Sequence, residues 1–243
     1  MCLYLGKETN KVIIMSSTER NEKIIKNEMG KLKNSISVKI FTDYKMKDGE
    51  KTRRCMSCDG VLNTLDLLVK HSNGKFDYKE ISVEEDEDLA KQHKVNRIPT
   101  ILFLSDENKE LIRYSAIPQG QELVPFLRTL QYYSGKSPFY KDQIISNLQK
   151  IKDSDLKLFI TQTCPYCPQV VPVVTLFAIV TNGKVHTEII DLDANPNEAN
   201  KYKVSGTPHA IINEDKNIYG MFNPQDLLDT LVEGKRDIGG MYA

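Results

Sequence analysis

Residues 159–167 read Phe-Ile-Thr-Gln-Thr-Cys-Pro-Tyr-Cys, and residues 55–58 read Cys-Met-Ser-Cys. Each stretch contains two cysteines separated by two residues, and apolar residues at helical spacing follow each pair. A proline lies 44 residues after the first cysteine of each pair, at Pro99 (99 minus 55) and at Pro208 (208 minus 164). These two stretches decide the fold, because they mark the same place in two copies of one unit.

The two copies are related by a constant offset along the chain. Subtracting residue numbers gives 109 for the first cysteines (164 minus 55), for the second cysteines (167 minus 58) and for the prolines (208 minus 99). The same shift pairs Ile81 with Ile190, Val83 with Leu192, Glu84 with Asp193, Lys94 with Lys203 and Val95 with Val204. A cysteine pair that arose by chance would not carry this downstream context, so we infer an internal repeat.

Each copy shows alternating strand and helix patterns, followed by a hairpin and a closing helix. This order predicts an α/β architecture of two tandem units, each with a central mixed sheet flanked by helices. We place the first unit at residues 15–134 and the second at residues 135–243, with residues 1–14 as an N-terminal extension. Ser137 and Pro138 offer an N-cap and an N1 proline, and they predict a helix at the start of the second unit, with Ile144, Leu148 and Ile151 on one face.

Composition narrows the classes of function. The 243 residues carry 33 basic and 33 acidic side chains, and no basic stripe is present, so nucleic acid is not an expected partner. The longest apolar run, residues 170–180, is far shorter than the roughly 20 residues of a spanning helix, so no membrane partner is expected. The N-terminus lacks the pattern of a secretory signal peptide. We therefore expect a cytoplasmic protein.

The cysteine pairs carry the predicted chemistry. Four of the five cysteines form the two pairs, which in a chain of this length favour a catalytic or metal-binding role over a disulfide scaffold. A cysteine at the start of a helix lies among unpaired backbone N–H groups at the positive end of the helix dipole, which stabilises a thiolate. Cys55 and Cys164 are thus the predicted nucleophiles. Cys58 and Cys167, one helical turn later, are the predicted resolving cysteines.

The two repeated X-Pro bonds are predicted to be cis. Proline is nearly the only residue that tolerates a cis peptide, and Ile98-Pro99 and Thr207-Pro208 recur at the same place in both copies. We expect each proline to lie against its dithiol, with the backbone of the preceding residue free to pair with an extended substrate. The alternative is an ordinary trans proline at the first residue of a strand.

The Cys-Pro-Tyr-Cys sequence with its later Thr207-Pro208 resembles glutaredoxin and thioredoxin, and the tandem arrangement resembles the protein disulfide oxidoreductases of archaea and some bacteria. The resemblance runs from about Met15 to the C-terminus. It implies two fused thioredoxin folds and reversible disulfide exchange with protein substrates. It also implies that no cofactor is needed, because the redox-active disulfides are the redox groups. A thioredoxin-reductase-type partner is expected to supply the electrons. Cys2, upstream of the resemblance, is interpreted as a free thiol.

The two sites are expected to be unequal. Phe41 and Cys55 are 14 positions apart, whereas Phe159 and Cys164 are 5 apart, so the first site contains a charged insertion. We predict that Cys164 and Cys167 carry most disulfide-reducing turnover, and that the first site is a relay or an oxidising site. Against this, Arg53 and Arg54 precede Cys55 and would favour its thiolate, although exposed charges are screened.

Three other functions compete with this interpretation. A zinc site built from the four cysteines is opposed by the 106 positions (164 minus 58) between the two pairs. A chaperone-like binding module would need neither intact dithiol. An electron-transfer arm of a peroxide-reducing flavoprotein would need a separate partner, because the chain has no Gly-rich dinucleotide motif. His209 follows Pro208 and is interpreted as a strand residue, the alternative being a group that tunes the second dithiol.

Overall fold

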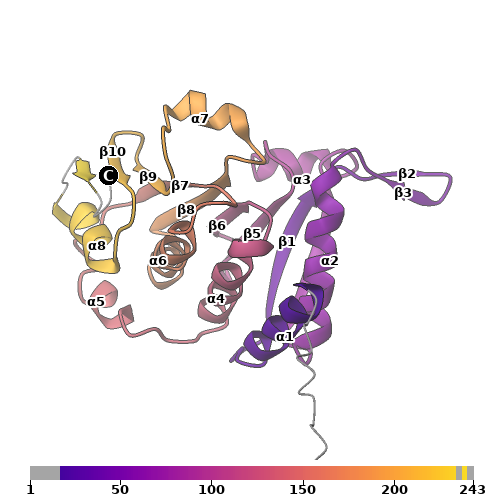
Figure 1. Ribbon diagram of the computed structural model, residues 1–243, viewed down its shortest axis with the longest axis horizontal. Helices are drawn as coiled ribbons and strands as arrows, with labels where there is room; N and C mark the ends of the chain where they lie inside the picture. Colours follow the sequence, from indigo (N-terminus) through magenta and orange to yellow (C-terminus); the bar gives the residue numbers. More distant parts are fainter. Residues whose placement is uncertain (1–16, 234–236, 240–243) are drawn as a thin grey trace, which may run out of the picture.

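The computed structural model describes residues 17–233 and 237–239 (Figure 1). The predicted extension, residues 1–14 with Cys2, lies outside the described residues. None of the helices described is long and apolar enough to cross a membrane.

Apart from two short strands inserted in the first half and one short strand at the end of the second, the elements follow one another in the expected order. The first half contains α1 (Ser17–Met29), β1 (Ile36–Thr42), β2 (Lys45–Lys47), β3 (Glu50–Thr52), α2 (Met56–His71), β4 (Phe76–Ser82), α3 (Glu87–Gln92), β5 (Thr100–Leu104), β6 (Glu110–Ser115), the short 3-10 helix η1 (Gly120–Glu122) and α4 (Leu123–Tyr133). The second half contains α5 (Lys141–Ser146), β7 (Ser154–Ile160), α6 (Cys167–Val180), β8 (Val185–Asp191), α7 (Pro196–Tyr202), β9 (His209–Ile212), β10 (Lys216–Tyr219), α8 (Pro224–Glu233) and β11 (Asp237–Gly239).

The sequence repeat is also a repeat of strand pairing. In the first half β1 pairs parallel with β4 and antiparallel with β5, and β5 pairs antiparallel with β6. In the second half β7 pairs parallel with β8 and antiparallel with β9, and β9 pairs antiparallel with β10. The α/β fold class with a mixed sheet is therefore confirmed. The residue at which one unit passes into the next stays a prediction.

The two sets of strands do not form separate sheets. They join into one nine-stranded sheet in the order β11-β10-β9-β7-β8-β6-β5-β1-β4. The junction is a parallel pairing of β6 with β8, which brings Arg113 opposite Glu188 and Tyr114 opposite Ile189. This junction connects strands far apart in sequence, so neither local propensity nor the repeat indicates it.

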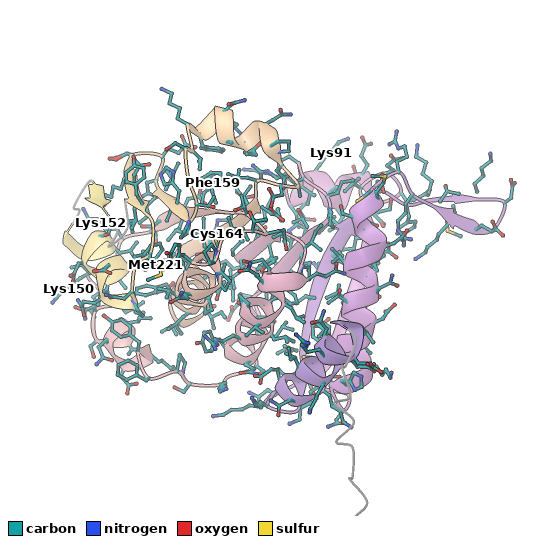
Figure 2. All side chains as sticks on the ribbon, in the orientation of Figure 1. Lys91, Lys150, Lys152, Phe159, Cys164 and Met221 are labelled. Carbon is teal, nitrogen blue, oxygen red and sulfur yellow. A yellow bond between two sulfur atoms is a disulfide. The ribbon has the colours of Figure 1, made fainter. Side chains whose placement is uncertain are left out.

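Helices cover the two faces of this sheet unequally. Figure 1 shows α4 and α6 side by side on one face, with α7 on the opposite face. The larger core lies under the first face and includes buried residues from α1, α2, α4, α6 and α8. Two small clusters lie on the second face, around Phe41 near α3 and around Phe159 near α7. Figure 2 labels Phe159, whose ring packs against that of Tyr202 at 5.1 Å.

The charged insertion forms a structure that the sequence patterns did not predict. Its residues build the two-stranded β2–β3 hairpin, which projects from the body of the molecule beside α2 (Figure 1). Asp48 and Gly49 connect the strands with φ values of 53° and 84°, the left-handed conformations of a tight hairpin turn. Every residue in both strands is exposed, so the hairpin adds nothing to the core.

The helix expected after Ser137 and Pro138 is shorter than its pattern indicated. It begins only at Lys141 and ends at Ser146, and the chain then continues through turns to Ile151. Ile144 and Ile151 are both buried, although only Ile144 lies in the helix. Apolar spacing therefore identified two of the three side chains as buried, Leu148 being half-buried, but overestimated the length of the helix, because turns can bury residues at the same spacing.

Candidate active site

Strand pairing explains why the second cysteine pair meets a proline loop distant in sequence. The antiparallel register of β7 and β9 places Phe159 opposite His209, so the end of β7 lies beside the start of β9. Thr161, after β7, and Thr207, before β9, are consequently neighbours, with their hydroxyl oxygens 3.0 Å apart. The first half repeats this arrangement, since Phe41 of β1 pairs with Thr100 of β5.

The second cysteine pair is reduced, and its first sulfur contacts backbone groups on two sides. Cys164 and Cys167 are free thiols, and the backbone N–H of Cys167 donates a hydrogen bond of 3.2 Å to Cys164 Sγ. The Thr207-Pro208 bond is cis, as predicted, and the Thr207 carbonyl oxygen lies 3.4 Å from Cys164 Sγ. The Cys164 sulfur therefore lies between an N–H donor and the backbone of the cis-proline loop.

The two cysteines of the second pair differ in solvent exposure. Cys164 keeps 6% of its surface exposed and Cys167 keeps none. Burial, together with the hydrogen bond to Cys164, raises the pKa of the Cys167 thiol far above its usual range. Cys167 thus stays protonated and inaccessible in the reduced site, which suits a resolving thiol better than an attacking one.

The helix after the second pair begins later than the sequence indicated. It starts at Cys167 rather than at Cys164: a 3.2 Å bond from the Cys164 N–H to the Thr161 carbonyl closes a turn over residues 161–164, and residues 165–166 form a bend. Pro165 and Pro168 have no N–H to offer a helical ladder, and the Cys167 N–H is used by sulfur instead of by a carbonyl. The prediction that Cys164 is the first residue of this helix was therefore wrong.

The first dithiol lies at the start of α2. Cys55 is the N-cap residue of this helix and forms a disulfide with Cys58. Cys58 is fully buried and Cys55 is half-buried, so the same division between exposed and buried sulfur recurs. The Ile98-Pro99 bond is cis, as predicted. The roles assigned to these residues in substrate binding stay predictions.

The two arginines before Cys55 both pair with carboxylates. Arg53 donates to Asp59 at 2.8 Å and to Glu80 at 2.6 Å, while the Arg54 guanidinium pairs with Glu84. Both positive charges are thus paired with carboxylates. Their help to a Cys55 thiolate stays a prediction, and pairing with other anions weakens the case for it.

Asp43, at the end of β1, is the functional candidate that the sequence patterns missed. Its carboxylate accepts backbone N–H bonds from Cys55, at 3.0 Å, and from Arg54, at 3.2 Å. Among the residues described, only Asp43, Cys55 and Cys58 form a group of three or more potential metal ligands, their ligand atoms lying within 4.8 Å of one another. The four cysteines therefore do not assemble into one zinc site. The only sequence feature that could have indicated Asp43 as a site residue is its position at the end of a predicted strand, directly before the insertion.

A second missed feature is a buried carboxyl cluster linked to the second site. The side-chain amide of Gln162, two residues before Cys164, donates to Asp191 at 3.0 Å and to the Ile117 carbonyl. Glu122 and Asp191 are both fully buried. Burial, and then the neighbouring charge of Asp191, raise the pKa of Glu122 to about 7.

His209 fits the strand interpretation. It is buried at the start of β9, pairs through Nε2 with Asn217 at 2.9 Å and packs against Tyr219 with ring centroids 4.5 Å apart. Burial lowers its pKa. These contacts are with neighbouring strands and aromatic rings rather than with sulfur.

Comparisons with known proteins agree with this fold. Residues 154–233 match the family model of the thioredoxin domain. A protein disulfide oxidoreductase from Aeropyrum pernix superposes with a TM-score of 0.74 at 24% identity, covering 93% of this chain and 97% of that one. The family match in the second half and the superposition over nearly the whole chain together show a thioredoxin-like fold. The particular arrangement is one continuous sheet carrying two dithiols.

A second group of similar proteins belongs to larger enzymes. A domain of the alkylhydroperoxide reductase AhpF from Enterococcus faecalis superposes with a TM-score of 0.74 at 16% identity, covering 88% of this chain and 98% of that one. By sequence, the chain is 26% identical over 141 residues to an alkyl hydroperoxide reductase protein of Staphylococcus aureus. The match covers 58% of this chain and 27% of that protein, so the chain spans about a quarter of the length of this relative.

Proposed function

We propose that the chain exchanges disulfides with protein substrates, that Cys164 and Cys167 carry most of the turnover, and that Cys55 and Cys58 act as a relay. The observation that carries this proposal is the environment of the Cys164 sulfur. The sulfur accepts a bond from the Cys167 N–H, and its thiol donates to the Thr207 carbonyl of the cis-proline loop, so the sulfur lies beside backbone with which an extended substrate would pair.

The surroundings of the second dithiol support binding of an extended peptide. The loop backbone beside the sulfur offers groups for strand-like pairing. A groove of about 220 Å³ lies close by in sequence, between α6 and the loop after β10. Its lining comes from Gln169, Val173, Met221, Phe222, Asn223 and Pro224. Such a groove would hold an apolar side chain of the substrate.

The assigned roles within the second pair can be tested by trapping. In Cys167→Ser the nucleophile remains but nothing resolves the mixed disulfide, so substrate should accumulate covalently on Cys164. Cys164→Ser should abolish exchange at this site. Peptide mapping by mass spectrometry locates the adduct, and substrate attached to Cys167 in the Cys164→Ser protein would show that the roles are reversed.

The dominance of the second site requires a comparison of double variants. We expect Cys164→Ser plus Cys167→Ser to lose at least about tenfold in turnover on a protein disulfide, a loss of roughly 1.4 kcal/mol in transition-state stabilisation. Cys55→Ser plus Cys58→Ser should keep most activity when the reductant is supplied chemically. Equal losses, or a greater loss from the first-site pair, would contradict the assignment.

The electron donor belongs to the same proposal. We infer a thioredoxin-reductase-type partner, acting in the cytoplasm, with the disulfides as the redox groups of this chain. The relatives named alkyl hydroperoxide reductase and NADH dehydrogenase favour a second candidate, a peroxide-reducing flavoprotein system. Nicotinamide oxidation in mixtures of this chain with each type of reductase would distinguish them, and no coupling with either would refute both.

A further inference from the structure

The first dithiol differs from the second in having a buried carboxylate at its helix N-terminus. Asp43 is 6% exposed, and its two oxygens accept N–H bonds from Cys55 and Arg54 at 3.0 to 3.2 Å. At the second site the corresponding N–H, that of Cys164, is accepted by a neutral carbonyl, that of Thr161, at 3.2 Å. One site therefore has a full negative charge where the other has a peptide dipole.

The charge of Asp43 lies close enough to act on the sulfurs. A carboxylate oxygen of Asp43 lies within 4.8 Å of both Cys55 Sγ and Cys58 Sγ. A thiolate on Cys55 would be a second anion at the same helix N-terminus. The positive end of one helix dipole amounts to about half a charge, so it cannot favour both anions fully.

The surrounding cations do not neutralise Asp43. Arg54 and Lys45 both pair with Glu84. Arg53 pairs with Asp59 and Glu80, and Lys51 also pairs with Glu80. Each of these cations is thus engaged by another carboxylate, and within the described part of the chain no cation lies within 4.0 Å of the Asp43 carboxylate as an ion pair. The repulsion between Asp43 and a Cys55 thiolate is therefore not screened by a direct counter-ion.

We propose that Asp43 holds the Cys55–Cys58 couple toward its disulfide form, so that the first site passes electrons on to other disulfides. This inference rests on the proposed function of the first site as a relay. Reduction breaks the sulfur–sulfur bond with two electrons from a donor dithiol, which becomes a disulfide, and the two protons of the donor end on Cys55 and Cys58. A reduced form that gains no stable thiolate is less stabilised, and its reduction potential is lower.

The same chemistry gives the relay a direction. The reduced first site transfers two electrons and two protons to the Cys164–Cys167 disulfide, which opens to two thiols while Cys55 and Cys58 close again. The reaction is favourable if the first couple has the lower potential. Asp43 acts through Cys55 rather than on the substrate, so it is a positioning residue.

The test is Asp43→Asn, with Asp59→Asn as the matched control. Asp59 lies in the first turn of the same helix, but its side chain is 65% exposed and pairs with Arg53. Each protein is equilibrated in dithiothreitol redox buffers, and mass spectrometry of peptides measures the redox state of each pair separately. In Asp43→Asn we expect the first couple to shift about tenfold toward the dithiol, equivalent to a potential about 30 mV higher. The second couple and the control should not shift.

A kinetic measurement keeps the inference testable independently of the potential. In a Cys58→Ser background, adding Asp43→Asn should make Cys55 alkylation at pH 7 about tenfold faster, and the pH midpoint of alkylation should fall by about one unit. Shifts below twofold, or equal to those of the control, would overturn the inference. Should Asp43→Asn fail to fold, Asp43→Ser supplies an uncharged acceptor oxygen. If the protein showed no turnover on protein disulfides, the proposed function would be wrong. The pH dependence of Cys55 alkylation could still be measured, so the two failures are distinguishable.

Discussion

At the scale of single residues, the least ordinary group outside the dithiols is Glu122. It is fully buried, its Oε2 accepts a 3.3 Å bond from the Tyr114 hydroxyl, and its Oε1 has no hydrogen-bond partner among the described residues. Burial is the main reason that its pKa rises to about 7, and the charge of Asp191 adds to it. Glu122 therefore changes protonation near neutral pH, which few glutamates do.

This shift predicts a pH-dependent stability. The folded-state pKa of Glu122 lies above the ordinary value of 4.5. The protonated carboxyl therefore contributes fully to the free energy of unfolding below pH 4.5, and this contribution is lost as the pH rises through about 7. Glu122→Gln keeps the neutral form at every pH. We expect it to exceed the original protein in free energy of unfolding at pH 8.5 by about 2 kcal/mol, and to match it at pH 5.

Urea unfolding at the two pH values measures this difference. Glu87→Gln is the control, because Glu87 is an exposed carboxylate in an ion pair with Lys91. A difference between Glu122→Gln and the original protein that does not grow with pH would show that the carboxyl is not the titrating group.

At the scale of elements, the β2–β3 hairpin is an addition to the repeat rather than a part of its core. Its two strands expose every residue, and an isolated two-stranded hairpin is marginal in water. Ion pairs hold it to the body, from Lys45 to Glu84 and from Lys51 to Glu80, and a 3.1 Å bond joins Met46 N–H to Glu85.

Deletion of the hairpin should leave the fold intact. Replacing residues 45–52 by Asn-Gly joins Tyr44 to Arg53, because the first and last residues of the hairpin, Lys45 and Thr52, are already paired. Exposed ion pairs are worth about 0 to 1 kcal/mol each, so the free energy of unfolding should fall by less than about 2 kcal/mol. Urea unfolding tests this, and turnover at Cys164 should stay unchanged. A loss of about 4 kcal/mol or more would mean that the hairpin supports the core.

At the scale of the whole molecule, the two halves are held together by more than the β6–β8 pairing. His186 of β8 contacts Asp155 at 2.8 Å and Glu110 of β6 at 2.9 Å. Arg97, almost fully buried, reaches from the first half to Glu188 and to Glu198 of α7, at 2.6 Å each. Buried charges of this kind need their partners, so loss of one member is costly.

His186 makes the stability of this junction depend on pH. The cause differs from that at Glu122, because here charge pairing rather than burial raises the pKa. Burial opposes the imidazolium, but hydrogen bonds and the charges of Asp155 and Glu110 outweigh it and raise the pKa of His186 to about 9. The contacts of the His186 imidazolium therefore stabilise the folded state fully below pH 6.5, the ordinary pKa of histidine, and this stabilisation is lost as the pH rises through about 9. His186→Gln should cost about 2 kcal/mol at pH 6 and much less at pH 10.

The measurement is chemical unfolding at both pH values, with His71→Gln as the control. His71 also contacts a glutamate, Glu22 at 2.8 Å, but both lie within the first half. Equal losses for His186→Gln at pH 6 and pH 10 would indicate a role in packing rather than in charge pairing.

The sequence by itself determined the repeated unit, the strand and helix order and the residues of both dithiols. These follow from local rules, since apolar spacing, paired cysteines and X-Pro dipeptides act over a few residues and recur with one offset. The two cis bonds were predicted on the same basis and are confirmed. Where local rules compete, as at Pro165 and Pro168, the start of the helix was misplaced by three residues (167 minus 164).

Only the tertiary structure decided how the halves combine and what surrounds each sulfur. The β6–β8 junction depends on hydrogen bonds between backbones about 75 residues apart (187 minus 112), which no local pattern encodes. The pairing of Arg53 and Arg54 with distant carboxylates, and the approach of Asp43 to Cys55, likewise depend on where folded strands end. Charge effects act through space rather than along the chain, so the difference between the two redox sites appears only in the folded molecule.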